Sequence, residues 1–120
     1  MSKKILIISR RAPYGESMAH EALDVALAAS IYDQDVGILY MDDGIFQLVK
    51  NQQPEGIARK NLGASLSALS LYGIEKIFVH KESLEERALA TKDLILDDIQ
   101  ILTSNDVKKL LDQQDHLLSF

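Results

Sequence analysis

The sequence contains no cysteine, and this absence limits its chemistry more than any other property of its composition. Disulfides, thiolate metal sites, iron–sulfur clusters and cysteine nucleophiles each require at least one thiol. None of them can form on this chain. Any covalent chemistry that depends on a thiol must therefore be supplied by another molecule.

Basic charge and long apolar segments are also in short supply. The chain has 13 Lys and Arg against 18 Asp and Glu, for a net charge of −5. Direct binding of nucleic acid requires a basic footprint, so the charge balance argues against it. Apolar runs such as residues 5–8 are far shorter than a membrane span, and the polar residues from Ser9 onward follow too soon for a signal peptide. We expect a cytoplasmic protein with no membrane contact.

Glycine is scarce where a phosphate-binding loop would need it. Residues 10–15, which follow the first apolar run, contain Gly15 as their single glycine and have no lysine. A dinucleotide fold requires G-x-G-x-x-G at this place, and a P-loop requires G-x-x-x-x-G-K-[ST]. A flavodoxin-like phosphate loop would be rich in Ser and Thr. We expect no bound cofactor.

The residues that are present predict one α/β domain spanning residues 1–120. Short β-branched apolar runs alternate with segments of helical periodicity, a pattern typical of βαβ units around a mainly parallel sheet. The expected strands are 5–9, 36–41, 77–80 and 99–102, with an edge strand at 117–120. The first three should be central in a three-layer domain of about five strands, with helices on both faces. Ser83 and Ser104 are expected to cap the two C-terminal helices, and Glu86 to complete a capping box with Ser83.

Polar residues follow three of the expected strands and define a candidate cleft. Ligands of open parallel sheets bind beyond the carboxyl ends of the strands. The residues of the candidate cleft are Arg10, Arg11, Tyr14, Asp42, Asp43 and His80. The same arrangement is expected of any α/β domain, because its loops are polar.

Two specific chemistries can be considered for this cleft. Paired acids such as Asp42 and Asp43 bind Mg²⁺ in phosphate-accepting receiver domains. Those domains place the acid pair after the first strand, so a turn or helix-capping role for Asp42-Asp43-Gly44 fits better. His80 has no nucleophile or G-x-S-x-G elbow beside it, so a surface or interface position is favoured over a catalytic one.

A helix expected at residues 57–72 has an unusual outer face. Residues 61–74 carry no charge, although an exposed helix normally presents Lys and Glu to water. Leu62, Leu66 and Leu69 form the stripe expected to pack on the sheet. Small uncharged residues on the remaining surface indicate close packing against another chain. The candidate interface residues are Gly63, Ala64, Ser67, Ala68, Leu71 and Tyr72.

Several segments, taken in order, resemble a known family. These segments are residues 12–15 (Ala-Pro-Tyr-Gly), 21–30, 43–48, 53–54, 71–75 and 83–89. Together they resemble the TusC/DsrF branch of the DsrE-like family, over almost the whole chain.

The resemblance implies a subunit rather than an enzyme. It implies sister TusB-like and TusD-like subunits in a dimer of heterotrimers, which passes persulfide sulfur towards 2-thiouridine formation at the tRNA wobble position. In that family the sulfur-bearing cysteine belongs to the TusD/DsrE subunit, near the end of its third strand. His80 roughly occupies that place here, as expected of a non-catalytic structural subunit. Two alternatives stay open: a subunit of a DsrEFH-type complex in sulfur oxidation, and an independent small-ligand or anion-binding protein.

Overall fold

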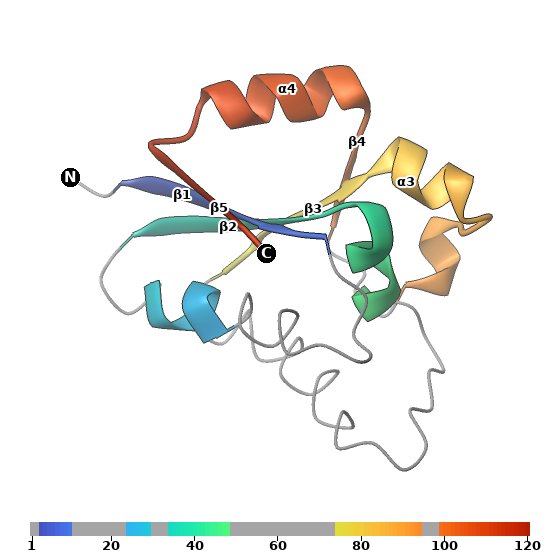
Figure 1. Cartoon of the computed structure of the whole chain (residues 1–120), viewed down its shortest axis with the longest axis horizontal. Coiled ribbons are helices and arrows are strands. Elements are labelled where there is room, and N and C mark those ends of the chain that lie inside the picture. Colours follow the sequence, from blue (N-terminus) through green and yellow to red (C-terminus); the bar gives the residue numbers. More distant parts are fainter. Residues whose placement is uncertain (1–2, 11–23, 30–33, 49–73, 95–98) are drawn as a thin grey trace, which may run out of the picture.

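The computed structural model describes residues 3–10, 24–29, 34–48, 74–94 and 99–120, and Figure 1 shows its architecture. Five parallel strands form one sheet in the order β4-β3-β2-β1-β5. The strands are β1 (Lys4–Ser9), β2 (Asp35–Tyr40), β3 (Lys76–His80), β4 (Gln100–Leu102) and β5 (His116–Ser119). The expected strands are confirmed, and the first three of them are the inner strands of the sheet.

Alternate residues of a strand point to opposite faces of the sheet. Successive residues of the inner strands are apolar, so both faces of the sheet are apolar. Ile7, Ile38 and Val79 belong to one buried cluster, while Leu6, Leu39 and Phe78 belong to the other. Buried parallel strands require cover on both faces. This requirement explains why the strands read as continuous apolar runs instead of alternating with polar residues.

Helices lie on both sides of the sheet (Figure 1). On one side is α4 (Ser104–Asp112), whose Val107 is buried against Leu6, Leu39 and Phe78. On the other side are the helical segment 24–29 and the 3-10 helix η1 (Asp42–Leu48). Two short elements, α3 (Lys81–Glu86) and the 3-10 helix η3 (Thr91–Asp93), join β3 to β4. The predicted α/β fold with a mainly parallel sheet and helices on both faces is confirmed.

The predicted helix caps were wrong at two positions. The N-cap of α3 is His80, so Ser83 lies inside the helix and forms no capping box with Glu86. The N-cap of α4 is Thr103, which forms a capping box with Asp106. Both serines therefore keep their hydroxyls available for other partners.

A tight contact joins the ends of β1 and β2 at the carboxyl edge of the sheet. The backbone N–H of Met41 donates to the carbonyl oxygen of Ser9 at 3.1 Å, and the side-chain amide of Gln47 donates to the Ser9 hydroxyl at 2.7 Å. A Cβ atom on Gly44 would lie only 2.0 Å from the Ser9 carbonyl oxygen. The absence of a side chain at Gly44 is what allows η1 to start against β1.

Within the described residues, no helix is long and apolar enough to cross a membrane.

Candidate functional site

The structure brings four residues of the candidate cleft to one edge of the sheet. Arg10 follows β1, Asp42 and Asp43 begin η1 after β2, and His80 ends β3. The Arg10 Nε atom lies 2.8 Å from Asp42 Oδ2. Asp43 pairs instead with an arginine that the sequence analysis did not single out, since its Oδ1 atom lies 3.0 Å from Arg87 Nη2.

The other predicted site residues lie outside the described part of the chain. These residues are Arg11 and Tyr14 of the candidate cleft, and Gly63, Ala64, Ser67, Ala68, Leu71 and Tyr72 of the candidate interface. Their roles stay predictions.

His80 is the centre of a hydrogen-bond network that spans four elements. Its Nδ1 atom lies 2.6 Å from Ser83 Oγ in α3, and its Nε2 atom lies 2.8 Å from Ser104 Oγ at the start of α4. The Ser83 hydroxyl also accepts the backbone N–H of Asp42 at 2.9 Å. With 13% of its side chain exposed, His80 links β3, α3, α4 and the start of η1.

The donors and acceptors of this network favour one tautomer of His80. The carboxylate of Glu82 can only accept, so the Ser104 hydroxyl donates its proton to Glu82 and must itself accept from His80. The second ring nitrogen, Nε2, then carries the proton and donates to Ser104 Oγ. With both ring nitrogens bonded to serine hydroxyls of the same chain, His80 connects β3 to α3 and α4.

Glu82 lies at the solvent side of the network. Its Oε2 atom accepts the backbone N–H of Ser104 at 2.9 Å, and its Oε1 atom lies 3.8 Å from His80 Nε2. The hydroxyl of Ser104 and then its backbone N–H stabilise the carboxylate, so the pKa of Glu82 is lowered from its ordinary value of 4.5. The negative charge of Glu82 thus holds the first turn of α4 against α3.

The lowered pKa of Glu82 predicts how stability depends on pH. A carboxyl group with a lowered folded-state pKa contributes stability above its ordinary pKa of 4.5, and this stability is lost as the pH falls through the folded-state pKa. We expect Glu82→Gln to remove part of the acid-dependent loss of stability, as measured by urea unfolding at a series of acidic pH values. Glu85→Gln, an exposed position on the same helix, controls for the loss of one charge. An unaltered acid dependence in Glu82→Gln would show that the contact with Ser104 does not persist in solution.

The geometry supports positioning more readily than catalysis. The carboxylates of Asp42 and Asp43 each bind a different arginine, so they do not face one metal ion together. No group of three His, Asp or Glu side chains converges as a metal site among the described residues. Asp42 has a φ of 51°, a left-handed conformation that Asp tolerates better than most residues, and it starts the 3-10 helix. The turn role predicted for Asp42-Asp43-Gly44 fits this geometry.

Sequence reasoning missed Ser83, Ser104, Glu82 and Arg87 as members of this site. One signal was present: Ser83 stands three residues after His80, a spacing that brings two side chains together within one helical turn. Ser104 follows the expected fourth strand, whose carboxyl end meets that of the third in a parallel sheet. Neither signal is enough to predict the hydrogen bonds of His80. The bond to Ser104 also depends on the register of β3 against β4, in which His80 is opposite Leu102.

Comparison with known proteins gives a consistent family assignment. A family model described as "DsrE/DsrF-like family" matches residues 3–120. The protein TusC homolog of Pseudomonas aeruginosa is 40% identical over 119 residues, which cover 99% of each chain. The intracellular sulfur oxidation protein DsrF of Allochromatium vinosum is 36% identical over 131 residues, covering 98% of this chain and 96% of that protein.

The fold is also that of a solved structure. The crystal structure of the ychN protein from E. coli matches with a TM-score of 0.81, at 26% identity, over 100% of both chains. The matching region includes all five strands and the edge that carries His80. By its sequence along nearly its full length and by its fold, the chain belongs to the DsrE/DsrF-like family.

Proposed function

We propose that this chain is a non-catalytic structural subunit of a cytoplasmic, heteromeric sulfur-relay complex of the TusBCD type. The complex would support 2-thiouridine formation at the tRNA wobble position, with sister TusB-like and TusD-like subunits in a dimer of heterotrimers. The observation that carries the proposal is the absence of cysteine from a chain that matches the family from residue 3 to residue 120. The persulfide would then be carried by a partner subunit.

The arrangement around His80 supports a structural role. The resemblance to the family implies a sulfur-bearing cysteine near the end of the third strand of a sister subunit, and this chain has His80 at the end of β3. Both ring nitrogens of His80 are engaged by serine hydroxyls, so the residue orders the carboxyl edge of the sheet. We propose that this edge, with Arg10, Asp42 and Asp43, is a surface presented to the assembly.

Sulfur labelling tests the non-catalytic role directly. Incubated alone with a persulfide donor loaded with labelled sulfur, the chain is expected to remain unlabelled, because persulfide formation requires a thiolate. Mass spectrometry under non-reducing conditions would measure any retained label. A sister subunit that contains a cysteine serves as the positive control, and stable label on this chain would disprove the proposal.

Sulfur oxidation is the second candidate, and it has one specific observation in its favour. The similarity to the Allochromatium vinosum protein, whose name assigns it to intracellular sulfur oxidation, extends over nearly both chains. A pull-down of the tagged chain from its native cytosol, with partners identified by mass, distinguishes the role in tRNA thiolation from the role in sulfur oxidation. Recovery of a tRNA-thiolating enzyme supports the first role, and recovery of sulfur-oxidation enzymes supports the second. A chain recovered alone with a bound small molecule would favour an independent ligand-binding protein.

The uncharged segment 61–74 provides a test of assembly. We expect Ala68→Glu to weaken the complex while leaving the domain folded, since an unpaired charge buried in an interface costs several kcal/mol, on the order of 3–5. Ala28→Glu is the matched control, because Ala28 is exposed in the helical segment 24–29. Size-exclusion chromatography with light scattering measures the assembly, and a thermal melt run beside it measures the stability of the domain. Unchanged assembly with an unchanged melt would place Ala68 in solvent, and a collapsed melt would place it in the core.

A further inference from the structure

The strand β5 lies at one lateral edge of the sheet, and its outer side has none of the features that usually block a strand edge. It is the last strand in the order β4-β3-β2-β1-β5, and its residues His116–Ser119 are all exposed. Natural edges are blocked by Lys, Pro, a bulge or a very short strand. β5 has no Lys or Pro and pairs with β1 without a bulge, whereas β4 at the other edge is only 3 residues long. β5 is therefore open to pairing with another strand.

The backbone groups of β5 show which residues are available on this outer side. Phe120 uses both of its groups on β1: its N–H donates to the Ile8 carbonyl oxygen at 2.8 Å, and its carbonyl oxygen accepts the Arg10 N–H at 2.9 Å. The backbone groups of successive residues in a strand point to opposite sides. Those of Leu117 and Ser119 therefore point away from β1. Within the described part of the chain, no other strand pairs with them.

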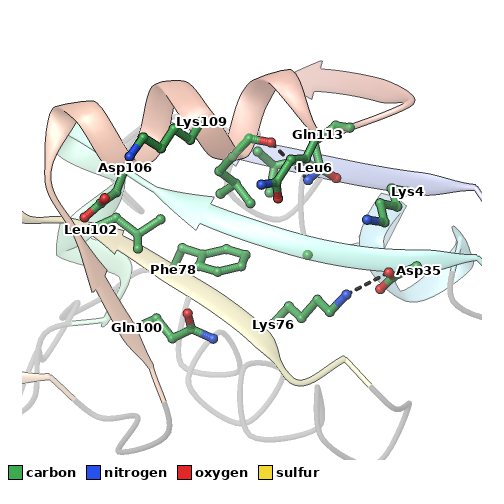
Figure 2. A pocket seen from close by; sticks show the side chains of 13 residues that line it. Lys4, Leu6, Asp35, Lys76, Phe78, Gln100, Leu102, Asp106, Lys109 and Gln113 are labelled. Carbon is green, nitrogen blue, oxygen red and sulfur yellow. Dashed lines mark hydrogen bonds and ion pairs between the residues drawn. The ribbon is translucent and has the colours of Figure 1, made fainter.

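Two leucines of β5 are exposed, one on each face of the sheet. Leu117 is opposite Leu6 of β1, and Leu118 is opposite Ile7. Leu6 and Ile7 are fully buried, and Figure 2 shows Leu6 under α4. Leu117 and Leu118 are 47% and 41% exposed, so the cover of both faces is incomplete at β5. An extension of the sheet beyond β5 would bury more of both leucines.

We propose that β5 pairs with β5 of a second copy of this chain, in antiparallel orientation about a two-fold axis at Leu118. A two-fold contact joins the same surface of both copies. In this register Leu117 of one copy exchanges both backbone hydrogen bonds with Ser119 of the other. Leu118 lies beside its own counterpart in a non-hydrogen-bonded pair, where side chains are closest. His116 lies beside Phe120 of the other copy.

The charge of β5 favours a second copy as the occupant. Near a two-fold axis each side chain lies close to its own counterpart, so a charged strand would oppose like charges, which is destabilising. Residues 116–120 contain no Lys, Arg, Asp or Glu. The register at Leu118 also satisfies the outward backbone groups of Leu117 and Ser119 in both copies at once. It does not require Asp115, whose N–H already donates to the Lys4 carbonyl oxygen at 2.8 Å.

The pairing has a consequence for the sulfur-relay complex, and this consequence alone rests on the proposed function. A dimer of heterotrimers contains two copies of this chain, and a two-fold contact between them would join the two heterotrimers. A strand pair is smaller than the usual stable interface. We therefore expect weak self-association of the isolated chain and a tighter contact within the complex, where further contacts act together with it.

Disulfide trapping in the full-length chain tests the register. The chain contains no cysteine, so any disulfide must join introduced thiols. Leu118→Cys would bring its two Cα atoms to about 4.5 Å, the spacing of a non-hydrogen-bonded pair and within disulfide range. Leu117→Cys is the matched control, because Leu117 is similarly exposed but its two Cα atoms would lie roughly 9 Å apart, beyond disulfide reach. Under mild oxidation the covalent dimer should form at least about tenfold faster with Leu118→Cys.

Light scattering on the cysteine-free chain measures the pairing without a covalent bond. The dimer fraction should rise with concentration. Leu118→Lys should weaken dimerisation by about tenfold or more, because two ammonium groups would face each other across the axis. Asn105→Lys, at an exposed position of α4, adds the same charge away from β5 and should have no effect. Thermal melts should show that all variants stay folded.

The proposal is overturned if the cysteine-free chain stays monomeric up to about 1 mM. It is also overturned if Leu117→Cys forms the covalent dimer as fast as Leu118→Cys, or if the two lysine variants weaken dimerisation equally. In the complex purified with its sister subunits, the Leu118→Cys disulfide should again join two copies of this chain. Its loss there would show that a sister subunit covers β5, which contradicts the proposal. None of these readouts measures sulfur, so their failure is distinguishable from a failure of the labelling test.

Discussion

Gly44→Ala is expected to destabilise the folded chain by about 3 kcal/mol or more, the upper range for overpacking a core. The new Cβ atom would lie 2.0 Å from the Ser9 carbonyl oxygen and 2.7 Å from the Ser9 carbonyl carbon. Both atoms belong to the backbone of β1, so no side-chain rotation can relieve the contact. The 3-10 helix η1 would have to move away from the sheet, and urea unfolding would measure the cost.

Gly37→Ala is the matched control for this prediction. Its nearest contacts would be Phe78 Cε2 at 3.2 Å and the Lys76 carbonyl oxygen at 3.3 Å, distances that a shift of a few tenths of an ångström can accommodate. We expect a change of about 1 kcal/mol or less, since alanine also restricts the unfolded chain. Equal losses of stability in the two variants would mean that the close approach of η1 to β1 is not maintained in solution.

The second large effect is expected at Ser83, whose hydroxyl connects the side chain of His80 to the backbone of Asp42. Ser83 is 1% exposed, and its hydroxyl bonds both His80 Nδ1 and the N–H of Asp42. Ser83→Ala leaves these two polar groups without their partner, and each half-buried group left unsatisfied costs about 1–3 kcal/mol. We expect a loss of about 2–3 kcal/mol in the free energy of unfolding.

Ser104→Ala provides the comparison for Ser83→Ala. Ser104 bonds the other ring nitrogen but is exposed, so water can replace its hydroxyl. Its loss should cost about 1 kcal/mol or less. A double-mutant cycle of Ser83→Ala with His80→Ala should show that the two effects do not add, because they remove the same hydrogen bond. Additive effects would contradict the network described for His80.

The inner strands could be predicted because their signal is local. Residues 5–9, 36–41 and 77–80 are apolar runs with β-branched residues, and both faces of an inner parallel strand are buried. The alternation of such runs with helical segments then predicts parallel pairing. Part of the strand order could also be predicted from the sequence, since β1, β2 and β3 are consecutive in the chain and are neighbours in the sheet.

The helix starts and the His80 network could not be predicted in the same way. Thr103 and Ser104 are adjacent residues with hydroxyl groups, and local pattern does not distinguish which of them caps α4. At α3 the chain passes directly from β3 into the helix at His80, a residue without a capping side chain. The bonds of His80 join positions up to 24 residues apart, so they depend on the packing of β3 against β4 and α4.

Residues near the two ends of the chain pair with each other, and this pairing has a consequence for folding. Ile5 of β1 is opposite His116 of β5, while β2, β3 and β4 add on the other side of β1. During synthesis from the N-terminus, one edge of β1 therefore stays unpaired until nearly the whole described chain has been made. Unpaired strand edges are where growing chains aggregate. A ribosome-bound chain lacking residues 116–120 should depend on chaperones that shield this edge, and the release of the last strand should end that dependence.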